Sequence, residues 1–95
     1  MSMERFKLSA DISTSDPKEI EPVLTKVIGV NGIIRTEKGF RVKTTMEGQS
    51  ATELNLNLLT ALRRVEKGTI LRAEWTTGRV TERFIDYVLK GIERI

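Results

Sequence analysis

The chain has 95 residues, of which 39% are hydrophobic and 31% are charged, a composition typical of one folded domain over residues 1–95. It contains neither cysteine nor histidine, which excludes disulfides, thiolate nucleophiles, cysteine–histidine zinc sites and histidine acid–base catalysis. No apolar run approaches the roughly 20 residues of a membrane span, and the N-terminal stretch lacks the apolar centre of a signal peptide. We therefore expect a cytoplasmic protein with no membrane contact and no cofactor.

The net charge of +3 is unevenly distributed along the chain. Residues 1–31 carry four basic and five acidic side chains, whereas residues 32–95 carry twelve basic and eight acidic ones. This excess of positive charge in the second part favours an anionic contact there, although the total is too small to identify the partner.

The first elements are a predicted strand and a predicted helix. Residues 6–12 alternate between apolar and polar side chains, and this period of two predicts a strand with one buried face. Asp16 followed by Pro17 is typical of a helix start, and apolar residues recur at helical spacing from there to Ile28. Because proline inside a helix removes a hydrogen bond, Pro22 leaves two alternatives. Either the helix begins at Pro22 after a separate turn, or the helix is kinked at that residue.

Residues 33–45 predict a β-hairpin with its turn next to Gly39. A two-residue loop would place the charged Arg35 on the same face as Phe40, whereas a three-residue loop places Ile34 there. We expect the three-residue loop, because it keeps the charged side chains out of the core.

The stretch 50–68 predicts the clearest helix in the chain. Ser50 and Glu53 have the spacing of a capping box, and Gly68 stands where helices often end in a left-handed residue. We expect the apolar stripe between these signals to face the core. The stripe consists of Leu54, Leu58, Ala61, Leu62 and Val65.

The last part of the chain predicts a fourth strand and a further helix. Residues 70–75 alternate in polarity, which is typical of a strand. Apolar residues at helical spacing over 80–95 then predict a helix with Thr81 as its cap. The alternative is a strand through residues 83–88, since Phe, Ile, Tyr and Val favour sheets. We prefer the helix because the amphipathic run continues to Ile95.

This order of elements predicts an α+β fold. The simplest layout is a four-stranded antiparallel sheet with two helices on one face, the ferredoxin-like β-α-β-β-α-β arrangement, plus a C-terminal helix.

Basic side chains gather on the predicted sheet face that points away from the helices. An open basic sheet is how several RNA-binding domains meet their ligand, so we expect contact with RNA or DNA there. Readers of single strands stack bases on exposed aromatic rings, whereas the aromatic residues of these strands have inward parity. The competing interpretations are a solvated face and a face covered by the last helix. The candidate nucleic-acid contacts are Lys7, Arg35, Arg41, Lys43 and Arg72.

The outer side of the 50–68 helix is a second candidate surface. Leu56 lies nearly opposite the apolar stripe, Leu59 lies on its flank, and Arg63 falls on the side of Leu56. These positions predict self-association or packing against a protein partner. Cover by the C-terminal helix is the competing account.

No catalytic constellation is evident. The acidic residues are scattered, and the glycine-containing stretches lack the phosphate-loop pattern. The sequence therefore favours a non-enzymatic binding or accessory domain that contacts RNA or DNA. The alternative is a homodimeric or protein-interaction subunit without a nucleic-acid role.

The strand–helix–hairpin–helix order of Phe6–Glu66 resembles the small dimeric subunits of the archaeal tRNA-modifying KEOPS assembly. In those proteins, too, an amphipathic helix with a serine/alanine start and an internal asparagine follows the hairpin. The elements after Gly68, including the sequence AEWTTGRVTERF, have no counterpart there. The resemblance therefore assigns no functional residue to this chain.

Overall fold

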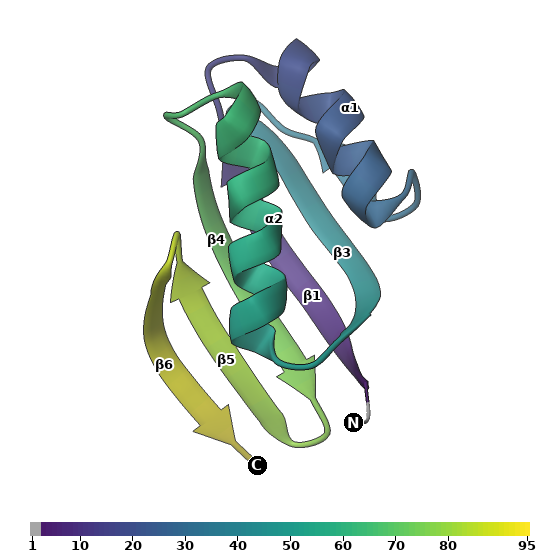
Figure 1. The fold of residues 1–95 in the computed structure, drawn as a ribbon, viewed down its shortest axis with the longest axis vertical. Helices are drawn as coiled ribbons and strands as arrows, with labels where there is room; N and C mark the ends of the chain where they lie inside the picture. Colours follow the sequence, from purple (N-terminus) through teal and green to yellow (C-terminus); the bar gives the residue numbers. More distant parts are fainter. Residues whose placement is uncertain (1–2) are drawn as a thin grey trace.

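The computed structural model describes residues 3–95 and contains one six-stranded antiparallel sheet and two helices (Figure 1). The strands lie in the order β2-β3-β1-β4-β5-β6. The first two residues of the N-terminal stretch discussed above lie outside the described range. Within that range, neither helix has the length and apolar character needed to cross a bilayer. In chain order, the elements are β1 (Glu4–Ser13), α1 (Pro17–Ile28), β2 (Ile33–Arg35), β3 (Gly39–Gly48), α2 (Ala51–Val65), β4 (Ile70–Thr77), β5 (Val80–Ile85) and β6 (Val88–Arg94).

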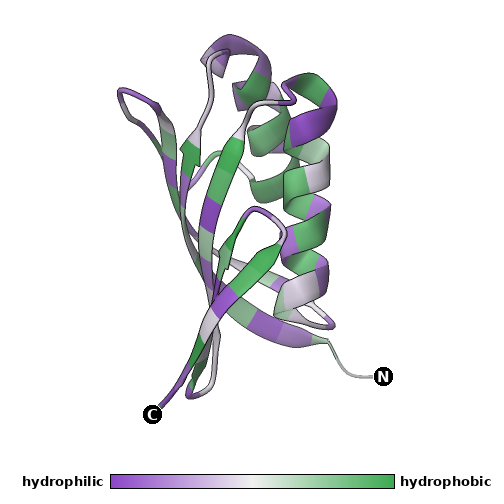
Figure 2. Cartoon of the chain, turned by 90° about the vertical axis from the view of Figure 1, so that its left-hand side faces the viewer, coloured by the Kyte–Doolittle hydropathy of each residue, from purple (hydrophilic) through white to green (hydrophobic). Residues whose placement is uncertain are grey.

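Both helices cover the same face of the sheet, and the hydrophobic core lies between the two layers (Figure 2). β1 is central because it pairs with β3 on one side and with β4 on the other. Along β1, the apolar side chains from Phe6 to Ile12 are at most 3% exposed, and the polar residues between them point to the opposite face. The period-two pattern of residues 6–12 therefore predicted both the strand and its buried side.

The expected ferredoxin-like sheet of four strands with a C-terminal helix is wrong. Residues 80–95 instead form the β5–β6 hairpin, which adds two strands beside β4. Phe84 and Val88 are four residues apart, a spacing that fits a helix, but the β-branched and aromatic residues of this segment favour a sheet. Asp86 turns the chain with a φ of 54°, a left-handed conformation that no α-helix contains. Thr81, the expected helix cap, consequently lies within β5.

α1 runs without interruption from Pro17 to Ile28, with Pro22 inside it. The alternative in which the helix begins at Pro22 is therefore wrong. Asp16 precedes the helix, but its side chain makes no capping hydrogen bond. Burial of Ile20 and Leu24 against the sheet layer stabilises the helix despite the proline.

The β2–β3 hairpin does not have the expected register. Thr36 and Gly39 exchange backbone hydrogen bonds of 2.9 and 3.4 Å, so the loop between them has two residues. Arg35 consequently lies opposite Phe40, and Ile34 points outward with 63% of its surface exposed. The charge is tolerated because β2 is a three-residue edge strand, where the Arg35 guanidinium lies 5.3 Å from the centre of the Phe40 ring.

α2 begins as the capping pattern predicts, since the backbone N–H of Glu53 donates to Ser50 Oγ at 3.1 Å. The helix ends at Val65, with Glu66 as its C-cap residue. Gly68 is not left-handed, so its expected role as the helix stop is wrong. Its N–H instead donates to the Glu66 side chain at 2.9 Å.

The buried face of α2 is rotated from the expected stripe. Val65 is 41% exposed, whereas Asn55 and Leu59 are buried. The cause is the wider sheet: Asn55 bonds to Trp75 on β4 and to the backbone of Asp86 in the β5–β6 turn. Because β5 and β6 extend the sheet on that side, side chains that would face solvent above a four-stranded sheet face the core here.

Candidate nucleic-acid interface

The sheet face opposite the helices carries charged and hydroxyl side chains, and no element between residues 3 and 95 covers it (Figure 2). We call this the outer face. Strand pairing sets neighbouring side chains in rows across β3, β1 and β4. One row contains Arg41, Asp11 and Arg72, and the next contains Lys43, Ser9 and Glu74.

Each acidic side chain that the strands place on the outer face is held by an arginine, whereas Glu37 of the β2–β3 loop, at one end of this face, forms no ion pair within residues 3–95. Arg41 Nε donates to Asp11 Oδ1 at 3.0 Å, and Arg5 pairs with Glu47 at 3.3 Å. Arg83 on β5 binds Glu74 on β4 and Glu93 on β6 at the same time. These side chains are 42–74% exposed, so the pairs contribute little to stability. Their effect is to neutralise the negative charge of this face.

Arg83 remains charged throughout the physiological range. Its hydrogen bonds to Glu74 and then to Glu93 raise the pKa of its guanidinium above the ordinary value for arginine. Its positive charge therefore offsets the two carboxylates that it binds.

On the outer face of β1, β3 and β4, three basic side chains form no ion pair within the described residues: Lys7, Lys43 and Arg72. Lys7 lies beside Thr45, and Lys43 lies beside Ser9 on the paired strands. Ammonium groups next to hydroxyls suit the oxygens of a phosphate, because each oxygen can accept several hydrogen bonds.

Four adjoining hollows follow β1 along this face. The first and second share Asp11 and Arg72, the second and third share Ser9 and Glu74, and the third and fourth share Lys7. The first and the third each have a volume of about 450 Å³. We call the combined depression the β1 groove.

The β1 groove is predominantly basic. From Arg5 to Ser13 it follows β1 for about 26 Å, at about 3.3 Å per residue. Its acidic side chains are Asp11, Glu37 and Glu74. Its basic side chains are Arg5, Lys7, Lys38, Arg41, Lys43, Arg72, Arg83 and Lys90.

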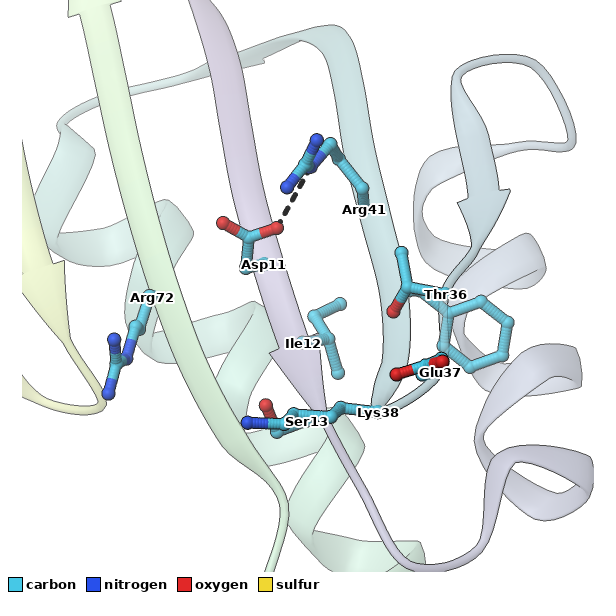
Figure 3. A pocket seen from close by; sticks show the side chains of 9 residues that line it. Asp11, Ile12, Ser13, Thr36, Glu37, Lys38, Arg41 and Arg72 are labelled. Atoms are coloured by element: carbon cyan, nitrogen blue, oxygen red, sulfur yellow. Dashed lines mark hydrogen bonds and ion pairs between the residues drawn. The ribbon is translucent and has the colours of Figure 1, made fainter.

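The end of the groove next to the β2–β3 hairpin is shown in Figure 3. Arg41 reaches from β3 to Asp11 on β1, whereas Arg72 lies on the other side of Asp11 and points away from it. Lys38, from the hairpin loop, also lines this end. The groove therefore offers a cation on each side of a carboxylate that is already neutralised.

The structure unites four of the five predicted nucleic-acid contacts on one face. Lys7, Arg41, Lys43 and Arg72 all line the groove, but Arg35 does not, because the hairpin register turns it toward the helix side. Sequence reasoning also missed Arg5, Arg83 and Lys90. Arg5 could have been predicted, because it is two residues from Lys7 on the same strand and therefore shares its face. Arg83 and Lys90 could not, because their segment was predicted to be a C-terminal helix.

The predicted partner surface on α2 is smaller than expected. Leu59 is fully buried, so its expected place on an exposed flank is wrong. Arg63 binds Asp86 at 3.0 Å, donates to the Thr69 carbonyl at 3.0 Å and lies 5.4 Å from the centre of the Tyr87 ring. Only Leu56, at 48% exposure, remains free for a partner.

No group of three or more acidic side chains that could hold a metal ion occurs in residues 3–95. Comparison of the chain with protein-family models, with curated proteins and with solved structures found no match.

Proposed function

We propose that the β1 groove binds the phosphate backbone of RNA or DNA, and that the protein is a non-enzymatic binding or accessory domain of the cytoplasm. One observation carries this proposal. The carboxylates that the strands place on the outer face are neutralised by arginines, whereas Lys7, Lys43 and Arg72 on the same strands have no acidic partner among the described residues. The net positive charge is therefore concentrated on unpaired side chains along one groove, where it attracts a polyanion.

The form of the groove favours contacts with the backbone rather than with the bases. Phe6, Phe40 and Trp75 are at most 2% exposed, so they offer no surface on which bases could stack. A groove of about 26 Å accommodates about eight nucleotides at about 3.4 Å each. We therefore expect binding that depends on salt and that is largely independent of sequence.

The proposal is tested by fluorescence anisotropy with labelled RNA and DNA, single-stranded and duplex, at low ionic strength. The double variant Lys7→Glu/Lys43→Glu should lose binding, because it reverses both free charges in the middle of the groove. Lys18→Glu/Lys26→Glu is the matched control, since it makes the same charge change on exposed positions of α1. Absence of binding by the unmodified protein, or an equal loss in the control, would refute the proposal.

The alternative function, a protein-interaction subunit that uses the outer side of α2, has less support. Of the residues predicted for this surface, Leu59 is buried in the core, and Arg63 binds Asp86 in the β5–β6 turn. A single exposed leucine is ordinary on a protein surface, so we do not favour this function.

A further inference from the structure

The pair Asn31 and Gly32 forms a turn between α1 and β2 (Figure 1). Asparagine is a chemically labile residue, and a following glycine increases the risk of side-chain amide loss. Glycine has no side chain to hinder attack of its own backbone nitrogen on the asparagine side chain. The other two asparagines of the chain, Asn55 and Asn57, are each followed by leucine. Asn31 is therefore the one asparagine whose neighbour offers no steric protection.

The structure leaves both reacting groups of this pair accessible. Asn31 and Gly32 are exposed. Within residues 3–95, neither the side chain of Asn31 nor the N–H of Gly32 takes part in a hydrogen bond. Asn57 is also exposed, but it lies inside α2, where the N–H of Leu58 is held by the carbonyl one turn earlier. The fold therefore protects Asn57 and leaves Asn31 open to reaction.

We propose that Asn31 is a site of spontaneous deamidation. The backbone nitrogen of Gly32 gives its proton to the solvent and attacks the side-chain carbonyl carbon of Asn31. A carbon–nitrogen bond forms, and the amide nitrogen of Asn31 takes up a proton and leaves as ammonia. Water then opens the resulting cyclic imide at either of its two carbonyl carbons. The products are aspartate and isoaspartate, and the net change is the exchange of ammonia for water, without oxidation or reduction.

Isoaspartate at this position should disturb the pairing of β2 with β3. The carbonyl of Gly32 accepts a hydrogen bond of 2.8 Å from the N–H of Lys43, and a Cβ atom on Gly32 would collide with the Lys43 carbonyl oxygen. The turn is thus packed closely against β3. Isoaspartate inserts a methylene group into the main chain directly before Gly32, so this close approach cannot be kept. Since β2 has only three residues, few other backbone bonds hold it in place.

Peptide mapping by mass spectrometry tests the reaction on the intact, folded protein in mildly alkaline buffer, where the Gly32 nitrogen loses its proton most easily. We expect progressive conversion of Asn31 to aspartate and isoaspartate, while Asn55 and Asn57 keep their amides. Asn31→Gln is the control and should stay unmodified, because glutamine would have to form a larger ring. Conversion of Asn57 as fast as Asn31 overturns the proposal. Persistence of the Asn31 amide in the folded protein does so too, and its loss only after unfolding in urea would show that the fold blocks the attack.

Hydrogen exchange tests the structural consequence. The amide of Lys43 should be protected in fresh protein and should exchange faster once isoaspartate has formed. Val42 pairs with Ala10 on β1, and its N–H points to that strand because successive residues of a strand bond to opposite sides. Its exchange should therefore stay unchanged.

Asn31→Asp is the matched control for this measurement, because it supplies the new negative charge without lengthening the main chain. It should leave the amide of Lys43 protected. Equal protection of Lys43 before and after isoaspartate forms, or faster exchange in Asn31→Asp, overturns the assigned consequence. Neither experiment depends on nucleic-acid binding, because the reaction needs no ligand.

Discussion

The indole N–H of Trp75 donates a hydrogen bond of 3.1 Å to the side-chain oxygen of Asn55, and both residues are buried. The amide nitrogen of Asn55 in turn donates to the Asp86 carbonyl at 2.7 Å. One asparagine on α2 thereby satisfies a polar atom on β4 and another in the β5–β6 turn. This asparagine, and not the apolar stripe alone, connects the central helix to the last hairpin.

Replacing Asn55 should therefore destabilise the whole fold. Asn55→Leu keeps a similar volume but leaves the buried Trp75 N–H and the partly buried Asp86 carbonyl without partners, at about 1–3 kcal/mol for the buried group. Urea unfolding followed by tryptophan fluorescence measures the loss. Asn57→Leu on the exposed side of α2 is the matched control and should change stability by at most about 0.5 kcal/mol. Equal effects of the two variants would contradict the role assigned to Asn55.

Arg63 should hold the β5–β6 turn against α2. Its ion pair with Asp86 is only 28–29% exposed, and its bonds to Thr69 and its contact with Tyr87 would be lost together in Arg63→Ala. We expect a loss of about 1–3 kcal/mol and faster hydrogen exchange in β5 and β6. The neighbouring exposed Arg64→Ala variant should leave both quantities unchanged, and faster exchange in that control would count against the prediction.

Most helices and strands up to β4 could be predicted from the local sequence, because each polarity pattern matches either the helical repeat or the strand repeat but not both. Residues 6–12 alternate strictly between apolar and polar side chains, and the spacing of Ser50 and Glu53 indicates a helix start. The last hairpin did not follow, because the spacing of Phe84, Val88 and Ile92 suits a helix, and only the turn at Asp86 distinguishes the two. The secondary-structure propensity of a segment does not show which other element of the fold the segment will pair with.

The same limit explains which site residues were predicted. Lys7, Arg41, Lys43 and Arg72 belong to strands whose parity was correct, so their common face was correct too. The face of Arg35 depended on the length of one loop, and a shift of one residue reverses every side chain of a strand. The burial of Asn55 depends on β5 and β6, so no reading of α2 alone could reveal it.

Gly39 should resist substitution because of the close approach of β1. A Cβ atom at this position would lie 2.1 Å from the carbonyl oxygen of Ile12, and this backbone cannot move without disturbing the β1–β3 pairing. We expect Gly39→Ala to destabilise the protein by about 1–3 kcal/mol or more in urea unfolding. A Cβ at Gly91 would meet no atom within 4 Å, so Gly91→Ala should be neutral or slightly stabilising. Comparable losses in both variants would be inconsistent with this explanation.

The salt dependence of nucleic-acid binding should change each time one unpaired basic side chain of the β1 groove is removed. If Lys7 contacts a phosphate, Lys7→Ala should reduce the slope of log K against log salt concentration by about 0.9 on a duplex and about 0.7 on a single strand. Lys43→Ala should have the same effect. Anisotropy titrations at several salt concentrations measure the slope, and Lys26→Ala on α1 should leave it unchanged. An unchanged slope in both groove variants would show that these lysines do not contact phosphates.

Replacing Asp11 should increase the affinity for nucleic acid, whereas replacing a lysine of the groove should decrease it. Its carboxylate holds Arg41 at 3.0 Å and lies in the row between Arg41 and Arg72. Asp11→Asn removes the only acidic group of that row and releases Arg41, so affinity for nucleic acid should increase, most strongly at low salt, where charge interactions are least screened. Asp16→Asn makes the same change outside the groove and should have a smaller effect. Because loss of a surface ion pair costs little stability, the variant should fold normally, and unchanged or weaker binding would mean that the ligand does not approach this row.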